Sequence, residues 1–310
     1  MLSEEKIMGA LLKVSQLKKQ FGKFEALKNV TFELHSGEVL GYVGPNGAGK
    51  STTIRILLGL IKASSGSATI FGKNVFTDAL AIHKNIAYVP GDVYLWPNLS
   101  GGEIIDLFLK MHGHFDPQKR DELIKKFEFD PKKKARSYSK GNRQKVALIA
   151  ALASQAELYI FDEPTSGLDP LMEAVFQEEV ERLKQQGKAI LLSSHILSEV
   201  ERLCDKIAII RAGEIVEFGS LDEMRHLTRY EFKVETQEVI QDIEKIDFIH
   251  EVKFNSNEPR KISFQADSDR IQDVVSYLSN AHIIKLESNP QTLESLFLHH
   301  YTLENQEEKK

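Results

Sequence analysis

The sequence predicts an α/β fold in two parts, and three observations point to it. Residues Gly44 to Ser51 fill every fixed position of the pattern G-x-x-x-x-G-K-[ST], which cradles phosphate groups. Short apolar runs alternate with segments of helical apolar spacing through most of the chain. The last part reads β-α-β-β-α-β. We therefore expect a nucleotide-binding domain followed by a small α+β domain.

Composition is that of a globular chain of about two domains. The 310 residues are 42% hydrophobic and 27% charged, and the longest apolar run, Val146 to Ala153, is far shorter than the ~18 residues of a membrane span. The single cysteine, Cys204, and an N-terminus without the layout of a signal peptide lead us to expect a reducing cytosol. The net charge of −5 argues against a broadly basic nucleic-acid surface, and we expect no nucleic-acid partner. The basic patch Lys132 to Arg136 leaves local binding open, and a solvated helix end or loop is the alternative for it.

The first segment, Leu11 to Glu38, alternates apolar and polar residues and predicts two strands joined by a turn at Phe21 to Lys23. An aromatic ring on a polar turn gains little from core burial. Phe21 could instead stack on an adenine base, an interaction worth ~1–3 kcal/mol per base in nucleic-acid proteins. Ordinary packing at the edge is the alternative, and spacing does not decide between them.

The phosphate loop follows a buried strand, Val39 to Val43, and precedes a helix with apolar residues from Ile54 to Ile61. Glycines let the loop wrap with its N–H groups inward, and the helix N-terminus adds its positive end. Lys50 supplies a mobile positive charge, and Ser51 can offer its hydroxyl to a magnesium ion. We conclude that the chain binds a nucleoside triphosphate.

Beyond this helix, Gly66 to Gly72 predicts a hairpin and Ile86 to Val89 a strand that Pro90 stops. A helical insertion, Leu99 to about Phe129, comes next. Ser139 and Gly141 then stand at the start of another helix, where Ser139 can cap the helix or bind a phosphate and Gly141 permits close backbone approach. A plain helix cap is the alternative interpretation.

Two adjacent carboxylates end the apolar strand Leu158 to Asp162. Because neighbouring side chains at a strand end point different ways, Asp162 can hold magnesium while Glu163 accepts a proton from an attacking water. Such a base contributes typically ~10²–10⁴ in rate. Surface polarity is the alternative interpretation of the pair.

The rest of this part contains a tight turn, Ser166 to Pro170, a long helix, Leu171 to Gln186, and a buried strand, Ala189 to Leu192. His195 follows that strand closely, where it can sense a γ-phosphate. Two further strands, Lys206 to Ile210 and Glu214 to Phe218, then meet in a hairpin.

Taken together, these segments resemble the nucleotide-binding subunits of ATP-binding cassette (ABC) transporters from about Leu11 to Leu227. The resemblance implies a P-loop cassette with a mixed core sheet, an antiparallel β subdomain and a helical subdomain. It implies Glu163 and His195 as catalytic residues, and Ser51 and Asp162 as magnesium ligands. The residues implied to contact ATP are Phe21, Gly44, Pro45, Asn46, Gly47, Ala48, Gly49, Lys50, Ser51, Thr52, Ser139, Gly141 and Asp169. In that family two cassettes pack head to tail, with each ATP between the Walker motifs of one and the signature of the other.

Two departures from the family pattern stand out. Three of the five signature residues L-S-G-G-Q are replaced, by Tyr138, Lys140 and Asn142, and the resulting S-K-G form resembles the ABC-2 type exporter branch. The glutamine expected after Pro90 is Gly91, which has no side chain to ligate magnesium. Either Asp92 substitutes for it, or the link between ATP and the membrane subunit runs differently.

The aromatic loop Val93 to Pro97 corresponds to the region where the family's membrane subunit docks. Packing within the helical insertion is the alternative for this loop. The tail, Arg229 to about Tyr301, has the ferredoxin-like order, with helices predicted around Val239 to Ile246 and over Gln291 to Tyr301. We expect a cassette over residues 1–227, a ferredoxin-like domain over 228–304 and a disordered tail over 305–310.

The sequence therefore leads us to expect an ATPase subunit of an ABC-2 type exporter. It would hydrolyse MgATP as a homodimer and drive a separate integral membrane permease, which would hold it at the cytoplasmic side of the cell membrane. A soluble ABC ATPase that acts as a nucleotide-gated clamp is the alternative function. A third hypothesis is a cassette that binds ATP and only changes conformation. The presence of Glu163 and His195 argues against it.

Overall fold

A computed structural model describes residues 9–113, 115–221, 223, 229–240, 242–254, 258–279 and 281–290. The chain forms two compact units, Met1–Gly219 and Ser220–Lys310. The predicted helix Gln291 to Tyr301 and the predicted tail 305–310 lie outside the described residues. None of the described helices is both long enough and apolar enough to cross a membrane.

The first unit is built on one mixed sheet with the strand order β5-β4-β1-β2-β10-β9-β3-β8-β7-β6. The strands are β1 (Leu12–Phe21), β2 (Phe24–Leu34), β3 (Val39–Val43), β4 (Ser65–Ile70), β5 (Lys73–Asn74), β6 (Ile86–Val89), β7 (Leu158–Asp162), β8 (Ala189–Ser194), β9 (Lys206–Arg211) and β10 (Glu214–Ser220). Strands β9, β3, β8, β7 and β6 are parallel, whereas β2, β1, β4 and β5 pair antiparallel. The mixed core sheet and the antiparallel part are thereby confirmed.

The burial of each strand explains its sequence. Every residue of β3, β7 and β8 is buried. This is the pattern of parallel strands that are covered on both faces, and it accounts for their nearly continuous apolar runs. In β1, by contrast, buried residues tend to alternate with more exposed ones, because only one of its faces packs on the core. The parallel strands therefore form a rigid centre whose ends can carry a site.

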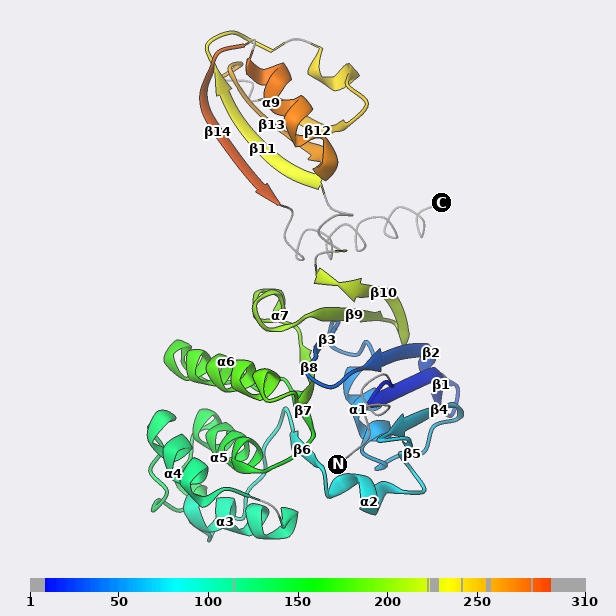
Figure 1. Ribbon diagram of the computed structural model, residues 1–310, viewed down its shortest axis with the longest axis vertical. Coiled ribbons are helices and arrows are strands. Elements are labelled where there is room, and N and C mark those ends of the chain that lie inside the picture. Colours follow the sequence, from blue (N-terminus) through cyan, green and yellow to red (C-terminus); the bar gives the residue numbers. More distant parts are fainter. Residues whose placement is uncertain are drawn as a thin grey trace. The chain divides into compact units, whose positions relative to one another are not determined.

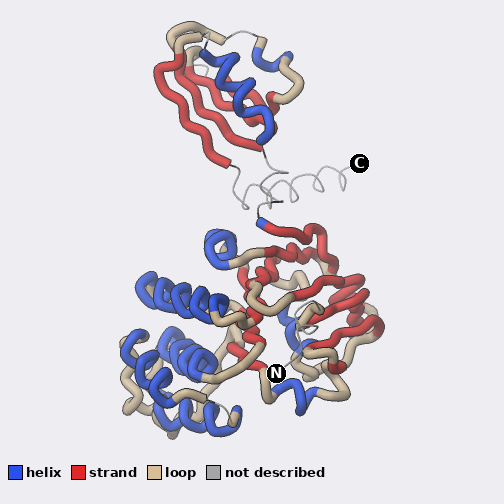
Figure 2. The backbone as a smooth tube through the Cα atoms, viewed as in Figure 1, coloured by secondary structure: helices blue, strands red, loops and turns tan. Residues whose placement is uncertain are grey.

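Helices pack around this sheet, and Figures 1 and 2 show α3, α4 and α5 gathered away from β1, β2 and β4. The helices of this unit are α1 (Lys50–Leu57), α2 (Ala79–His83), α3 (Gly101–His112), α4 (Pro117–Lys126), α5 (Lys140–Ala153), α6 (Pro170–Gln185) and α7 (Leu197–Leu203). Side chains cap several of them at the N-terminus: Ser100 and Glu103 form a capping box on α3, and Ser139 and Asp169 cap α5 and α6. The predicted helical insertion corresponds to α3 and α4.

The second unit contains an antiparallel sheet of four described strands in the order β12-β13-β11-β14. Its elements are β11 (Arg229–Thr236), β12 (Ile249–Phe254), β13 (Lys261–Asp267), α9 (Ile271–Ser279) and β14 (Ile283–Pro290), with single 3-10 turns at Ile243–Lys245 and Ser268–Arg270. One face packs into a core that includes the stacked rings of Phe232 and Phe264, 5.3 Å apart.

The helix predicted around Val239 to Ile246 is wrong. Among the described residues of this segment, only the 3-10 turn Ile243–Lys245 forms, and Asp242 before it has a φ of 61°, which does not continue a helix. Ile240 and Ile243 are nevertheless buried in the core of this unit. The apolar spacing therefore predicted correctly which residues are buried, but a 3-10 turn rather than an α-helix buries them.

Candidate active site

The phosphate loop connects β3 to α1, and its glycines are required by the backbone around them. Gly49 has a φ of 113°, and a Cβ atom there would lie 2.6 Å from the Leu27 side chain and 2.9 Å from the Ala26 carbonyl oxygen. At Gly44 a Cβ atom would lie 2.3 Å from the carbonyl oxygen of Ile210. Larger residues would thus collide with neighbouring strands, so these glycines let the loop curl tightly over the end of the sheet.

Lys50 lies in the centre of this loop and is only 5% exposed. Its ammonium group donates hydrogen bonds to the carbonyl oxygens of Gly44, at 2.5 Å, and Pro45, at 3.2 Å. Burial lowers the pKa of Lys50, and the nearby carboxylates of Glu163 and Asp162 partly oppose this shift. The loop therefore holds a largely desolvated cation where the motif places phosphate groups.

The two carboxylates at the end of β7 occupy different surroundings. Asp162 is 7% exposed, and burial raises its pKa, while the nearby hydroxyls of Ser193 and Ser51 act to lower it. Glu163 has a φ of 50° and donates its N–H to the carbonyl oxygen of Ser193 at 2.9 Å. This turn of the backbone separates the directions of the two side chains.

Glu163 and His195 lie together beside the phosphate loop. The Glu163 Oε1 atom is 3.3 Å from His195 Nδ1 and 4.0 Å from Lys50 Nζ. His195 follows β8, the strand that pairs with both β3 and β7. Parallel strands bring their carboxyl ends to one edge, and this edge gathers the loop lysine, both carboxylates and the histidine.

Ser51 and Asp162 fit a magnesium ion that arrives with a nucleotide. Their side chains are close enough for the Ser51 hydroxyl to influence the Asp162 pKa. Within the described residues there is no cluster of three or more His, Cys, Asp or Glu side chains suited to a metal ion. Magnesium is usually held by one or two protein oxygens together with phosphates and waters, so this sparse pair is the expected arrangement.

Asp92 is the other residue that the sequence offers as a magnesium ligand. Its side chain is exposed, whereas Gly91 lies against β7, where a Cβ atom would be 3.3 Å from the Asp162 carbonyl oxygen. The structure therefore brings the backbone of position 91 to the carboxylate edge. Phe21 ends β1 with its ring 49% exposed and the Lys19 ammonium 4.7 Å from the ring centre.

The signature residues contact their own subunit away from the phosphate loop. Ser139 Oγ accepts the N–H of Asn142 at 3.3 Å and caps α5. The Lys140 ammonium donates to Ser166 Oγ at 2.7 Å, and a Cβ atom at Gly141 would lie 2.3 Å from the Gly167 carbonyl oxygen. Asp169 also has a local contact, since Oδ1 accepts the N–H of Met172 at 3.1 Å to cap α6. One chain thus brings together the residues of the carboxylate edge, whereas the contacts of Ser139 and Gly141 are with α5 and with the turn at Gly167.

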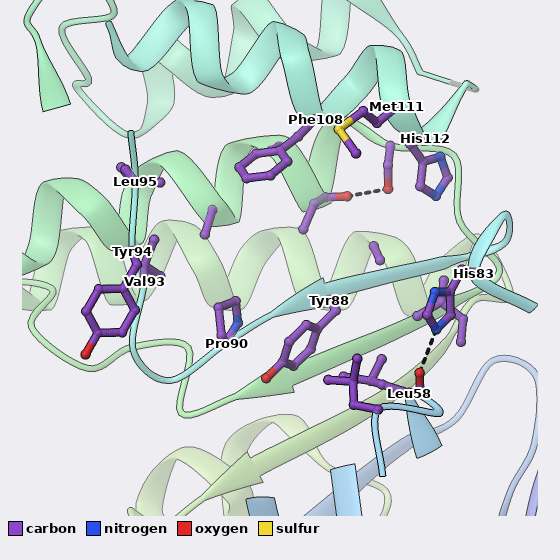
Figure 3. Close-up of a pocket in the computed structure, with 17 residues that line it drawn as sticks. Leu58, His83, Tyr88, Pro90, Val93, Tyr94, Leu95, Phe108, Met111 and His112 are labelled. Carbon is purple, nitrogen blue, oxygen red and sulfur yellow. Dashed lines mark hydrogen bonds between the residues drawn. The ribbon is translucent and has the colours of Figure 1, made fainter. Parts of the chain in front are cut away.

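An apolar groove of about 500 Å³ lies between the end of β6 and helices α3 and α5. Figure 3 shows Phe108 and Met111 approaching it from the helical side and Tyr88 and Pro90 from the strand side. In the aromatic loop, Tyr94 is 89% exposed. The ring of Trp96 packs against Phe108, with ring centres 5.9 Å apart. The loop therefore both packs on the helical insertion and presents an aromatic side chain to solvent.

Several buried polar residues behind the carboxylate edge, where Glu163 and His195 lie, were not identified from the sequence. Ser193 and Ser194 end β8 and are nearly fully buried, as is Glu199 on α7. Ser194 Oγ donates to Glu199 Oε2 at 2.6 Å. A glutamate at the fourth position after His195 was the only signal in the sequence, and it reads equally well as a solvated helix residue.

Comparison with known proteins gives consistent matches. Residues 27–166 match the family described as ABC transporter. The chain is 40% identical over 209 residues to an ABC transporter ATP-binding protein of Synechocystis, which covers 65% of this chain and 58% of that protein. It is 34% identical over 235 residues to the bacitracin transport ATP-binding protein BcrA of Bacillus licheniformis, with 74% and 77% covered.

A solved structure provides a further match. It is the dimeric structure of an ATP-binding cassette in a post-hydrolysis state, bound to ADP and Pi, with a TM-score of 0.61 and 26% identity. The match covers 68% of this chain and 98% of that cassette. The chain spans less than two thirds of the length of the Synechocystis relative, so its resemblance to that protein is confined to the matched part.

Proposed function

Because the chain belongs to the ATP-binding proteins of ABC transporters, a family of ATP hydrolases, we propose that it is the ATPase subunit of an ABC-2 type exporter. The observation that carries this proposal is the cluster of Lys50, Glu163 and His195 at the end of the parallel strands. The S-K-G signature and the similarity to a bacitracin transport protein support the exporter branch.

The chain's own residues divide the chemistry among them. The loop from Gly44 to Ser51 binds the phosphates through its N–H groups and the Lys50 ammonium. Ser51 and Asp162 would hold the magnesium ion that neutralises phosphate charge. Glu163 takes a proton from the attacking water, and His195, in contact with Glu163, orients the γ-phosphate.

The second half of each ATP site comes from another copy of the chain. Lys140 and Gly141 contact the 166–168 turn, Ser139 caps the helix that begins there, and the related cassette is dimeric with ADP and Pi bound. We infer a head-to-tail homodimer in which Ser139 and Gly141 approach the partner's γ-phosphate. The exposed ring of Phe21 stacks on the adenine, and Thr52 and Asp169 complete the nucleotide contacts.

The apolar groove beside β6 is the proposed docking site for a separate integral membrane permease. Its lining is mostly apolar, and exposed Tyr94 and Met111 stand at it. A helix from the permease would fill such a groove by the usual helix-in-groove mode. This contact would hold the chain at the cytoplasmic side of the cell membrane.

For the C-terminal part we propose a ferredoxin-like domain over residues 228–304, following a cassette over 1–227. The antiparallel strand order and the placement of α9 between β13 and β14 support this assignment. The first helix of that layout is here shortened to the 3-10 turn at Ile243–Lys245.

The first prediction tests the enzyme directly through Lys50→Ala. Purified wild-type chain should hydrolyse MgATP, and the variant should lose about 100-fold or more of that activity because the phosphates lose a desolvated cation. Phosphate release measures the rate, and Lys132→Ala, at an exposed lysine outside the site, serves as the matched control. Hydrolysis by Lys50→Ala at the wild-type rate would contradict the proposed function.

A further inference from the structure

The segment that carries His195 is fixed by a buried serine on its N-terminal side. Ser194 is 2% exposed, and its Oγ accepts the N–H of Ile196 at 3.0 Å. This hydrogen bond spans His195 and joins the residue before it to the residue after it. Such a local serine bond holds a turn in one conformation.

Glu199 on α7 holds that serine in turn. Its Oε2 atom accepts the Ser194 hydroxyl hydrogen at 2.6 Å, and the residue is 7% exposed. Burial raises the pKa of the Glu199 carboxyl, and the hydrogen bond from Ser194 and the nearby Thr165 hydroxyl oppose this. A short hydrogen bond to a buried carboxylate is among the stronger polar contacts in a protein.

The same carboxylate lies between the two segments that the chemistry needs. Thr165 belongs to the turn that directly follows Glu163, in which the N–H of Ser166 donates to the Glu163 carbonyl oxygen at 3.2 Å. On the other side stands the Ser194–Ile196 bond around His195. Glu199 thus bonds to the serine that precedes His195, and it lies near the Thr165 side chain on the turn that follows Glu163.

The His195 side chain is about half exposed to solvent. Because 51% of it is exposed, packing does not set its position, and its Nδ1 atom lies 3.3 Å from Glu163 Oε1. The place of the imidazole therefore depends on the backbone on either side of it. We propose that Ser194 and Glu199 are positioning residues that hold His195 against Glu163 for ATP hydrolysis, an inference that rests on the proposed function.

The kinetic test compares Ser194→Ala, Glu199→Ala and Glu199→Gln with the wild-type chain. The two alanine variants should lower kcat by up to about 100-fold, because small misplacement of a reacting group is costly. Their KM for ATP should stay within about twofold, since the phosphate loop is untouched. Glu199→Gln should keep most of the wild-type kcat, because the amide oxygen accepts the same bond from Ser194.

A His195→Ala background separates positioning from a general structural role. If Glu199 acts through His195, Glu199→Ala should cause no further loss of kcat there. An equal loss in both backgrounds, or wild-type kcat in Glu199→Ala, would overturn the proposal. Should Glu199→Ala fail to fold in a thermal melt, Ser194→Ala and Glu199→Gln still decide the question.

A second measurement does not need turnover. Hydrogen exchange at the Ile196 amide should be slow in the wild-type chain and at least tenfold faster in Ser194→Ala and Glu199→Ala. Unchanged exchange would overturn the proposed clamp even in an active enzyme. If the wild-type chain hydrolysed no ATP but the exchange rates changed as expected, the proposed function would fail while the anchoring of the His195 segment stood.

Discussion

At the scale of single residues, the site depends on an uncommon backbone conformation at Glu163. A φ of 50° in a residue other than glycine costs roughly 1–2 kcal/mol. The N–H bond to Ser193 supports this conformation. It directs Glu163 towards His195 while Asp162 stays buried near Ser51. Two adjacent carboxylates can therefore take different tasks, and strain of this kind is concentrated at functional sites.

The second prediction concerns Asp92, which follows the glycine in place of the expected glutamine. If Asp92 supplies the missing oxygen ligand, Asp92→Ala should require about tenfold more magnesium for half-maximal ATP turnover. Turnover at saturating magnesium should be close to wild type. Steady-state rates over a magnesium titration measure this, with the exposed Asp121→Ala as the control. Identical magnesium curves for Asp92→Ala and wild type would show that Asp92 does not replace the glutamine expected at position 91.

The sequence could predict which candidate residues stand at the ends of the parallel strands. A fixed motif identified Lys50 and Ser51, and apolar runs placed Asp162 and Glu163 at the end of β7. His195 was placed by the same reasoning. The conformation of Glu163 and the Ser194–Glu199 bond could not be predicted, because they depend on which groups meet across loops rather than on spacing along the chain.

At the scale of elements, a buried ionic cluster ties the helical insertion to the core. Glu179 on α6 is 2% exposed and accepts Lys119 at 2.7 Å and Lys126 at 2.9 Å, both from α4. The hydrogen bond to Glu179 raises the pKa of Lys126. Removing one charged residue leaves its partner buried without compensation, and this lowers the free energy of unfolding strongly. The loss is larger than the difference in stability between the intact cluster and a set of apolar residues in its place.

The third prediction follows from this cluster. Glu179→Ala should lower the free energy of unfolding of the first unit by roughly 3 kcal/mol, because Lys119 stays buried with less compensation. Urea unfolding followed by the fluorescence of Trp96, the single tryptophan, reports on this unit. Glu181→Ala removes an exposed glutamate from the same helix and should change the free energy by no more than about 0.5 kcal/mol. Equal effects of the two substitutions would show that the cluster does not stabilise the fold.

Helices and strands could be predicted where the pattern of buried residues is compatible with a single type of secondary structure. The runs that became β3, β7 and β8 are apolar throughout, and a parallel strand covered on both faces accounts for them. The segment around Ile240 and Ile243 has helical spacing, but a turn buries both residues equally well. The order of the ten-stranded sheet could not be derived, since pairs such as β2 and β10 join segments far apart in the chain.

At the scale of the whole molecule, the fourth prediction concerns the groove beside β6. Met111→Asp should abolish co-purification with a co-expressed permease, because it puts a charge at an apolar surface that the partner would desolvate. ATP hydrolysis by the isolated chain should be unchanged. Val216→Asp, on exposed β10, is the control and should leave the complex intact. Recovery of Met111→Asp with the membrane subunit at the wild-type level would remove the groove from the interface.

The central claim is that ATP is enclosed between two copies of the chain and cleaved with Glu163 as base. Glu163→Gln keeps the size of the side chain but cannot take a proton, so ATP should bind and stay uncleaved. The bound nucleotide should then hold the dimer together. Ser139→Trp in the same variant should release it by obstructing the partner's phosphates, whereas Ser137→Trp, at an exposed position two residues earlier, should not.

The most direct test is the mass of Glu163→Gln in solution with and without MgATP, measured by light scattering after size-exclusion chromatography. We expect an ATP-dependent shift from the mass of one 35.1 kDa chain to that of two, with intact ATP in the dimer peak. A mass that does not change with MgATP, or ADP in place of ATP after incubation, would contradict it.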